Sequence, residues 1–254
     1  APLIDLLFFV REGNPVGVAI AGALRETSGT DRGTDWRAYF AAAGRNDISL
    51  PQGYAEFKSR LLSELVDPAF AQFFPPGVQQ TSRVNLVEIV WGGVAVDGIP
   101  SLDTPTQIDP EQAARQGRRL TEFCRETEDG LDCRYPAPDE LVFGVSIGGE
   151  ARAYPLRILN WHELLNDVVG VTDRQVALVY CTLCGSAILY DTSVGPVTYT
   201  DPRTGARVTL DKGALEFGTT GLLMRSNKLM YDRETLTVSN AMTGREAFGP
   251  RADK

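Results

Sequence analysis

A Cys-x-x-Cys-Gly sequence between two apolar segments constrains the fold of this chain more than any other feature. Residues 176–180 are apolar, contain β-branched side chains and run directly into Cys181, and a second strand-like segment, 186–190, follows Gly185. Runs of this length and composition predict strands, and two strands joined by a short turn form a hairpin. The sequence therefore predicts a β-rich region in which both thiols lie at one end of a hairpin.

The first 80 residues carry a helical pattern instead. Residues 35–43 form a short amphipathic segment that Gly44 ends, and residues 54–74 place apolar side chains at roughly helical spacing. Pro75-Pro76-Gly77 ends that pattern, because proline and glycine interrupt helices. We therefore expect a helical N-terminal region over residues 1–80.

The remainder of the chain, residues 81–254, alternates predicted strands with turns. Apolar segments predict strands over 84–90, 141–147 and 151–154, and the last two flank a Gly-Gly-Glu turn typical of hairpins. The spacing of leucines predicts a short helix over residues 156–166. Helices in one part of the chain and strands in another indicate the α+β class, with an antiparallel, β-rich C-terminal domain.

The overall charge argues against one class of partner. The chain has a formal net charge of -8, a pI near 4.8 and no basic run that could neutralise the phosphates of nucleic acid or the surface of an anionic membrane. No segment reaches the roughly 20 uninterrupted apolar residues that a transmembrane helix needs. We expect no nucleic-acid partner and no transmembrane segment, and residues 1–80 are the candidate surface for a protein partner.

Two of the cysteines, Cys124 and Cys133, flank a polar loop that would close easily into a disulfide-linked hairpin. A metal site at these thiols would need more ligands nearby, and His162 is the only histidine in the chain. A disulfide would favour an oxidising compartment, and a chain that begins at Ala1 agrees with export. We expect a periplasmic or extracellular location; the alternative is two reduced surface thiols in a cytosolic protein.

The other two cysteines, Cys181 and Cys184, are the chemically most specific feature. In a thioredoxin-type redox motif, the second cysteine lies on a helix whose N-terminus lowers the pKa of the first thiol, whereas here strand-like segments flank the turn. This context favours a metal knuckle, with Gly185 relieving the backbone where it turns toward the sulfurs.

His162 lies nineteen residues before Cys181 and is the candidate third ligand, oriented by an acceptor such as Glu163. The alternative is a hydrogen-bonded structural histidine beside Trp161. A fourth position would be filled by water or by one of several further side chains. Methionine there would favour copper, whereas a carboxylate or water would favour zinc or iron. We therefore expect one transition-metal ion, zinc or copper or else iron, with further candidate ligands Glu163, Asp167, Asp191, Met224 and Met230.

A series of segments in a fixed order resembles the signature of a known family: Trp91-Gly92-Gly93, Asp97-Gly98-Ile99-Pro100, residues 149–156 (GEARAYPL), Trp161-His162-Glu163, Asn166-Asp167, Cys181-Thr182-Leu183-Cys184-Gly185, Phe217-Gly218, Gly221-Leu222 and residues 230–235 (MYDRET). Over residues 84–250 the chain resembles a widespread prokaryotic domain of unknown function. The resemblance implies that His162, Cys181 and Cys184 lie at matching positions, and it implies no established activity. Two features depart from the family pattern: Thr182 stands where proline is usual, and no tryptophan closely follows the 232–235 turn.

The cysteine turn supports three hypotheses. In the first, the chain binds one metal ion through Cys181, Cys184 and His162, in a structural, electron-transferring or catalytic role, so that the sequence leaves open whether it is an enzyme. In the second, Cys181 and Cys184 act as a metal-free dithiol oxidoreductase. In the third, the chain is a non-enzymatic subunit of a larger assembly and docks through its N-terminal helices.

Overall fold

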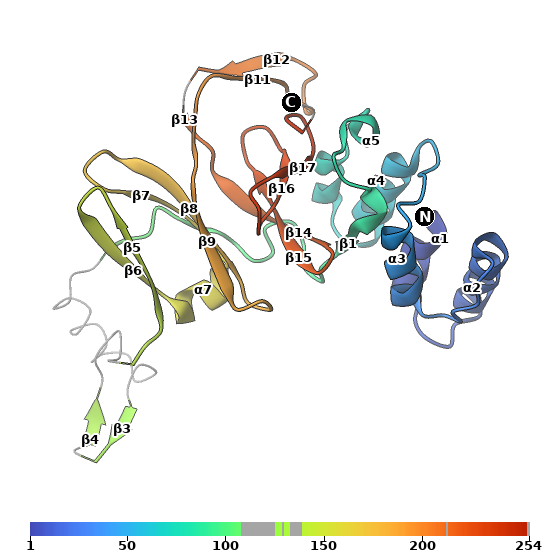
Figure 1. Ribbon diagram of the computed structural model, residues 1–254, viewed down its shortest axis with the longest axis horizontal. Helices are drawn as coiled ribbons and strands as arrows, with labels where there is room; N and C mark the ends of the chain where they lie inside the picture. Colours follow the sequence, from blue (N-terminus) through green and yellow to red (C-terminus); the bar gives the residue numbers. More distant parts are fainter. Residues whose placement is uncertain (108–124, 129, 133–138, 212, 253–254) are drawn as a thin grey trace. The chain divides into compact units, whose positions relative to one another are not determined.

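The computed structural model has helices mostly in the N-terminal part and antiparallel strands in most of the rest, which confirms the predicted α+β class (Figure 1). Among the helices that it describes, none combines the length and apolar character that a membrane-spanning segment needs. The chain forms two compact units, residues 1–99 with 194–254, and residues 100–193. The residues described are 1–107, 125–128, 130–132, 139–211 and 213–252.

The helices of the first unit begin at sequence signals that are visible locally. Asn14 caps one helix by accepting the N–H of Val16 at 2.9 Å, and Asp35 caps the next by accepting the N–H of Ala38 at 3.1 Å. The helices are α1 (Pro2–Phe9), α2 (Pro15–Ser28), α3 (Trp36–Arg45), α4 (Tyr54–Leu65) and α5 (Val78–Thr81), with 3-10 turns η1 (Pro68–Phe73) and η2 (Leu86–Glu88).

Two sequence predictions in this unit are corrected. The helical pattern of residues 54–74 is divided, because α4 ends at Leu65 and Asp67 caps a separate 3-10 turn that begins at Pro68. The predicted strand over 84–90 is wrong in its first part, since residues 86–88 form η2 and the strand begins only at Ile89. In both places a capping side chain, Asp67 or Asn85, starts a short turn that the apolar pattern does not reveal.

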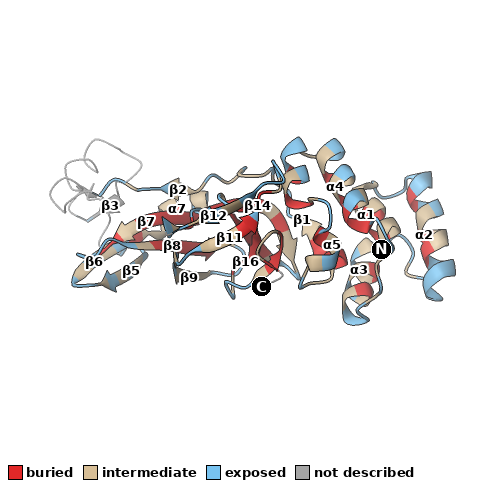
Figure 2. Cartoon of the chain, turned by 90° about the horizontal axis from the view of Figure 1, so that it is seen from above, coloured by how far each residue is buried: buried red, intermediate tan, exposed pale blue. Residues whose placement is uncertain are grey.

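One antiparallel sheet completes the first unit, in the order β1-β14-β15-β16-β17. Its side chains share a single hydrophobic core with the helices, so that Phe70 and Phe73 pack in the same cluster as Leu229 and Phe248. Figure 2 shows the buried residues along the inner faces of these helices and strands. The strands are β1 (Ile89–Trp91), β14 (Phe217–Met224), β15 (Asn227–Asp232), β16 (Val238–Asn240) and β17 (Glu246–Phe248), and the short strands β11 (Val197–Thr200), β12 (Arg207–Leu210) and β13 (Gly213–Ala214) precede β14. The division into domains at residue 80 stays a prediction.

The second unit contains the predicted hairpins. Its four-stranded sheet has the order β2-β7-β8-β9, in which only the pairing of β2 with β7 is parallel. A separate antiparallel hairpin, β5–β6, confirms the pairing predicted around the Gly-Gly-Glu turn. The elements are β2 (Leu102–Asp103), β3 (Arg125–Thr127), β4 (Gly130–Asp132), β5 (Val142–Ile147), β6 (Glu150–Pro155), α7 (Leu156–His162), β7 (Leu164–Val169), β8 (Arg174–Cys181) and β9 (Ser186–Asp191), followed by β10 (Ser193–Val194).

The helix predicted over 156–166 is wrong beyond residue 162. Glu163 adopts a left-handed backbone conformation with φ 54°, which ends α7, and residues 164–169 pair with β8 instead. Leu164 and Leu165 thus belong to a strand that is buried on both faces. Sheet pairing overrides the helical spacing of these leucines, as tertiary context commonly does.

Candidate functional site

The two cysteines of the sequence motif close the turn of the hairpin β8–β9. Cys181 ends β8 and pairs with Ser186, the first residue of β9. The N–H groups of Cys184 and Gly185 donate to the carbonyl oxygen of Cys181 at 3.2 and 2.9 Å, and Gly185 has a φ of 62°. The predicted turn between two strands is therefore confirmed, and glycine supplies the left-handed conformation that its last position requires.

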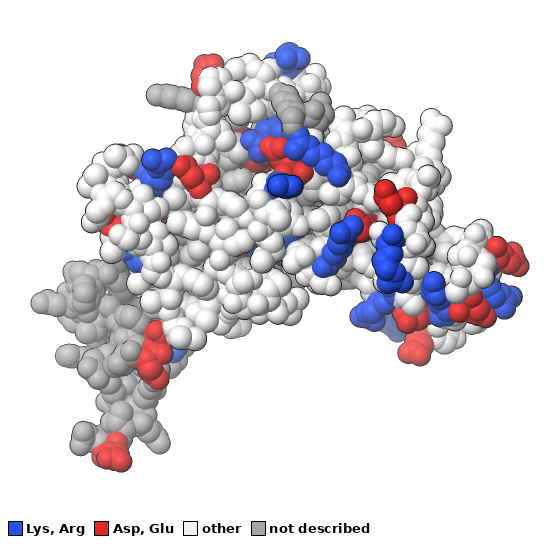
Figure 3. All heavy atoms as spheres, in the orientation of Figure 1, with Lys and Arg blue, Asp and Glu red and all other residues white. Residues whose placement is uncertain are grey.

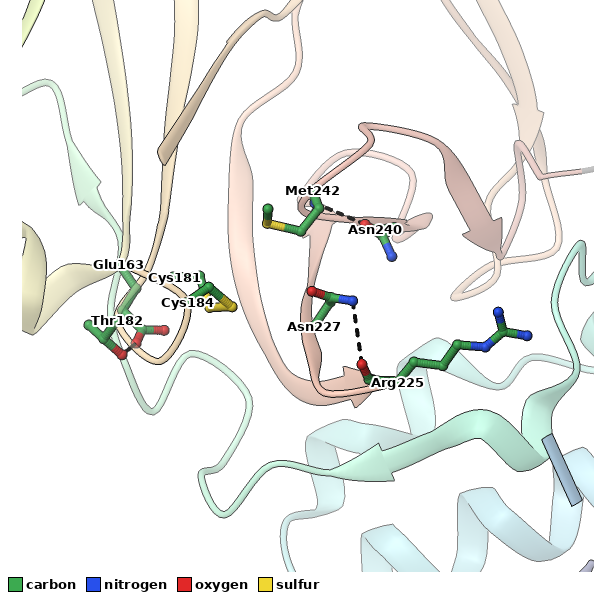
Figure 4. The surroundings of a disulfide bond; sticks show 8 residues. All are labelled: Glu163, Cys181, Thr182, Cys184, Arg225, Asn227, Asn240 and Met242. Carbon is green, nitrogen blue, oxygen red and sulfur yellow. Dashed lines mark hydrogen bonds between the residues drawn. A yellow bond between two sulfur atoms is a disulfide. The ribbon is translucent and has the colours of Figure 1, made fainter. Parts of the chain in front are cut away.

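Cys181 and Cys184 are joined by a disulfide bond, with their Cα atoms 5.2 Å apart (Figure 4). Cys181 is buried, whereas Cys184 and its neighbour Leu183 are exposed at the tip of the turn. A disulfide that closes so short a loop adds only about 2 kcal/mol by the chain-entropy relation. The two cysteines thus differ in exposure, and the bond contributes modestly to stability.

His162 is the last residue of α7, and its ring is fixed from one side. Nδ1 lies 3.0 Å from the carbonyl oxygen of Pro100. Because a carbonyl oxygen only accepts, Nδ1 carries the proton of the neutral imidazole and Nε2 is the basic nitrogen. This is the arrangement in which a histidine can bind a metal or exchange a proton through Nε2.

Glu163 links the end of α7 to the cysteine turn. Its backbone carbonyl accepts the N–H of Tyr180 at 2.9 Å, and its Oε1 accepts the hydroxyl of Thr182 at 2.5 Å (Figure 4). The residues on both sides of Cys181 are therefore hydrogen-bonded to the residue that follows His162. The Thr182 hydroxyl is the donor of this contact with Glu163.

Asp167 takes part in a buried polar cluster on the neighbouring strands. Its carboxylate accepts from Arg152 Nη1 at 2.8 and 3.1 Å and from the Tyr154 hydroxyl at 2.8 Å. Glu150 accepts from Arg152 Nε at 2.7 Å, and this hydrogen bond lowers the pKa of Glu150, whereas burial raises the pKa of Tyr154. The sequence signal for this cluster is the period of two in β6, which places Glu150, Arg152 and Tyr154 on one face of the strand.

A second polar cluster, in the first unit, joins residues 97 and 231–233, which are distant in sequence. Asp97 Oδ2 accepts from the Tyr231 hydroxyl at 2.6 Å and from Arg233 Nη1 at 2.9 Å, and Asp97 Oδ1 accepts the N–H of Thr219 at 3.0 Å. A Cβ atom at Gly218 would lie 2.6 Å from the Tyr231 ring and 2.7 Å from the Asp97 carboxylate. The residues of these segments therefore hold residues 94–97 against the sheet.

The other predicted site residues lie in different surroundings. Met224 ends β14 and Met230 lies buried in β15, both in the first unit, and Asp191 forms an ion pair with Arg174 at 2.5 Å. Among the residues that the structure describes, no three His, Cys, Asp or Glu side chains are grouped as a metal site. The predicted disulfide between Cys124 and Cys133 lies outside the described residues.

The chain belongs to the family described as a protein of unknown function (DUF3179), whose model matches residues 96–254. The match includes the cysteine turn, His162 and both polar clusters, and it begins after the Trp91-Gly92-Gly93 segment. No curated protein and no solved structure matches the chain.

Proposed function

We propose that the Cys181–Cys184 pair is a thiol–disulfide exchange centre. The observation that carries the proposal is the disulfide itself, placed at a turn where Cys184 is exposed and Cys181 is buried. A disulfide that closes a short loop contributes little to the free energy of unfolding. Exposed disulfides are also more easily reduced than buried structural ones. Both arguments favour a reactive rather than a purely structural bond.

The exposed sulfur sets the order of the exchange. A thiolate of a partner dithiol attacks Sγ of Cys184, the bond between Cys184 and Cys181 breaks, and Cys181 leaves as a thiolate that takes up a proton. The second partner thiolate then attacks the mixed disulfide and releases Cys184. The partner is oxidised to a disulfide and the Cys181–Cys184 pair is reduced by two electrons, and the reverse sequence reduces a partner disulfide.

The first test is a redox titration of the pair in glutathione buffers, with the two states separated by alkylation and mass spectrometry. We expect reversible two-electron reduction at a potential above roughly −300 mV, the value below which structural disulfides typically lie. The variant Cys181→Ser, which keeps the exposed thiol, should form a mixed disulfide with glutathione faster than Cys184→Ser. The double variant gives the background from Cys124 and Cys133. A potential well below that value, or equal rates in the two single variants, would show that the bond is structural.

A second candidate function, binding of one transition-metal ion by the reduced pair, is favoured by the hydrogen bond between His162 Nδ1 and Pro100. That bond leaves Nε2 basic, and two thiolates with one imidazole nitrogen suit zinc or copper, with iron as a further option. Three protein ligands would leave one coordination position open. The residue that follows His162 is tied to the turn through Thr182 and Tyr180, which supports this set of ligands.

For the metal, we expect the reduced protein to bind one equivalent of Zn²⁺ in competition with a chromophoric chelator. His162→Ala should weaken this binding by more than about tenfold. Tenfold is the smallest loss of metal affinity typical when a group that only orients a ligand is removed. Trp161→Phe, one residue away, is the matched control and should bind as tightly as the unchanged chain. Equal affinity in His162→Ala would remove His162 from the ligand set.

A further inference from the structure

A cavity of about 980 Å³ opens in the first unit, between α3, β1 and the turn that joins β14 to β15. Ligand sites of small organic molecules measure roughly 300–1,000 Å³, so this volume is at the upper end of that range. The cavity is formed within one compact unit and takes no residue from the cysteine turn. It is therefore a separate candidate site.

Aromatic rings form the apolar wall of the cavity. Phe8 packs edge-on against Trp36 with ring centroids 4.7 Å apart and against Trp91 at 6.4 Å, and Phe40 lies 5.8 Å from Trp36. Trp36, Phe40 and Trp91 are only partly buried. The Trp91 indole donates to the carbonyl oxygen of Val94 at 2.7 Å, which fixes the orientation of its ring. Such a wall presents flat apolar surface to a ligand.

Arginines supply the polar part of the lining. Arg37, Arg45 and Arg225 face the cavity, and among the described residues that line it Glu88 is the one acidic side chain. Glu88 already accepts from Arg225 Nε at 2.5 Å, so that Arg37 and Arg45 add positive charge beyond this pair. On the face drawn in Figure 3, basic side chains gather over the helices of this unit, with acidic ones among them. A cationic cavity in a chain with a net charge of -8 selects for anions.

The Glu88–Arg225 pair is built into the cavity wall. A Cβ atom at Gly44 of α3 would lie 2.8 Å from Glu88 Oε1, so glycine at this position allows the helix to approach the carboxylate. The guanidinium of Arg37 lies 5.0 Å from the centroid of the Trp36 ring, which places a cation beside the aromatic wall. Apolar surface and positive charge therefore occur side by side.

We propose that this cavity binds an organic anion with an aromatic body, such as an aryl carboxylate or sulfonate. The body of the ligand packs on Trp36 and Trp91, and its anionic group pairs with Arg37 and Arg45. This site is independent of the exchange at Cys181–Cys184, and its test uses the protein in either redox state.

The test uses two fluorescent probes that differ in one group, 1-anilinonaphthalene-8-sulfonate and the uncharged N-phenyl-1-naphthylamine. The double variant Arg37→Gln/Arg45→Gln should weaken binding of the sulfonate by roughly tenfold, because two charge-assisted contacts are lost at a solvent-facing rim. Binding of the uncharged probe should stay within about twofold, since its contacts are apolar. The control Arg11→Gln/Arg60→Gln changes the net charge equally at arginines that do not line the cavity and should bind both probes as the unchanged chain does.

Energy transfer from tryptophan locates the bound sulfonate. The chain has three tryptophans, of which Trp36 and Trp91 line the cavity and Trp161 lies exposed in the second unit. Trp36→Phe and Trp91→Phe should each reduce the transfer, because both rings line the cavity. No saturable binding, equal sulfonate affinity in the Arg37→Gln/Arg45→Gln double variant, or unchanged transfer in both Trp36→Phe and Trp91→Phe would each overturn the proposal.

Discussion

Replacement of Lys58 by alanine is expected to lower the free energy of unfolding by about 3–5 kcal/mol, the range found when one partner of a buried ion pair is removed. Lys58 lies on α4 with 2% of its surface exposed, and its Nζ is 3.1 Å from Asp5 Oδ1. The same ammonium group donates to the carbonyl oxygen of Ile89 at 2.5 Å, and the Tyr54 hydroxyl donates to Asp5 Oδ2 at 2.5 Å. Alanine would leave the Asp5 carboxylate buried without its cation.

The position of Lys58 explains the size of this effect. Its side chain joins α4 to α1 through Asp5 and to β1 through Ile89, so that one ammonium group connects three elements of the core. Burial lowers the pKa of Lys58, and the Asp5 carboxylate acts in the opposite direction. Burial of the Lys58 ammonium group without a partner would therefore cost much free energy, and the Asp5 carboxylate offsets this cost.

Urea denaturation followed by circular dichroism measures the change. Arg60→Ala is the control, because Arg60 lies on the same helix two residues after Lys58 and its ion pair with Glu64 is exposed. This variant should change the free energy of unfolding by less than about 0.5 kcal/mol. The double variant Asp5→Asn/Lys58→Met removes both charges and should recover part of the loss, because no buried charge is left unpaired. A change below about 1 kcal/mol in Lys58→Ala would contradict the buried ion pair.

The fold could be predicted from sequence where local pattern and tertiary pairing agree. The strands around the cysteine turn and the hairpin β5–β6 are of this kind, because both carry short apolar runs and a glycine turn. Residues 164–169 show the opposite case, since their leucines fit a helix and only the partner strand β8 makes them a strand. Lys58 fits an amphipathic helix equally well whether it is exposed or buried, and Asp5, its partner, is distant in sequence.

Some features of the candidate sites could likewise be predicted from the sequence, and others could not. The spacing of Cys181 and Cys184 predicts a turn that directs both sulfurs to one point, but it is interpreted as a metal knuckle and does not predict the disulfide that joins them. The contact of His162 with Pro100 could not be predicted, because the partner is a backbone carbonyl oxygen and every residue has one. The aromatic and arginine lining of the cavity combines residues from α1, α3, β1 and the turn after β14, and only the fold brings these together.

The second large effect is expected at a glycine of β14. Gly221→Ala should lower the free energy of unfolding by roughly 3 kcal/mol, from backbone strain and steric overlap together. Gly221 has a φ of 74°, and a Cβ atom there would lie 2.5 Å from the carbonyl oxygen of Val94 and 2.9 Å from that of Ala95. These are backbone atoms, and they are held by the bonds from Gly92 N–H to Gly221 and from Asp97 N–H to Thr219, at 2.8 and 2.9 Å. The overlap therefore has no flexible side chain to relieve it.

A second glycine separates the two causes. Gly205 has a similar φ of 70°, but a Cβ atom there would meet no atom within 4 Å. Gly205→Ala should therefore cost about 1 kcal/mol, the lower range for backbone strain alone, and the difference between the two variants measures the overlap at Gly221. Denaturation of both variants under the same conditions gives this difference directly. If the two alanines cost the same, residues 94–97 do not pack against β14 as closely as described, and the Asp97–Tyr231–Arg233 cluster loses its structural basis.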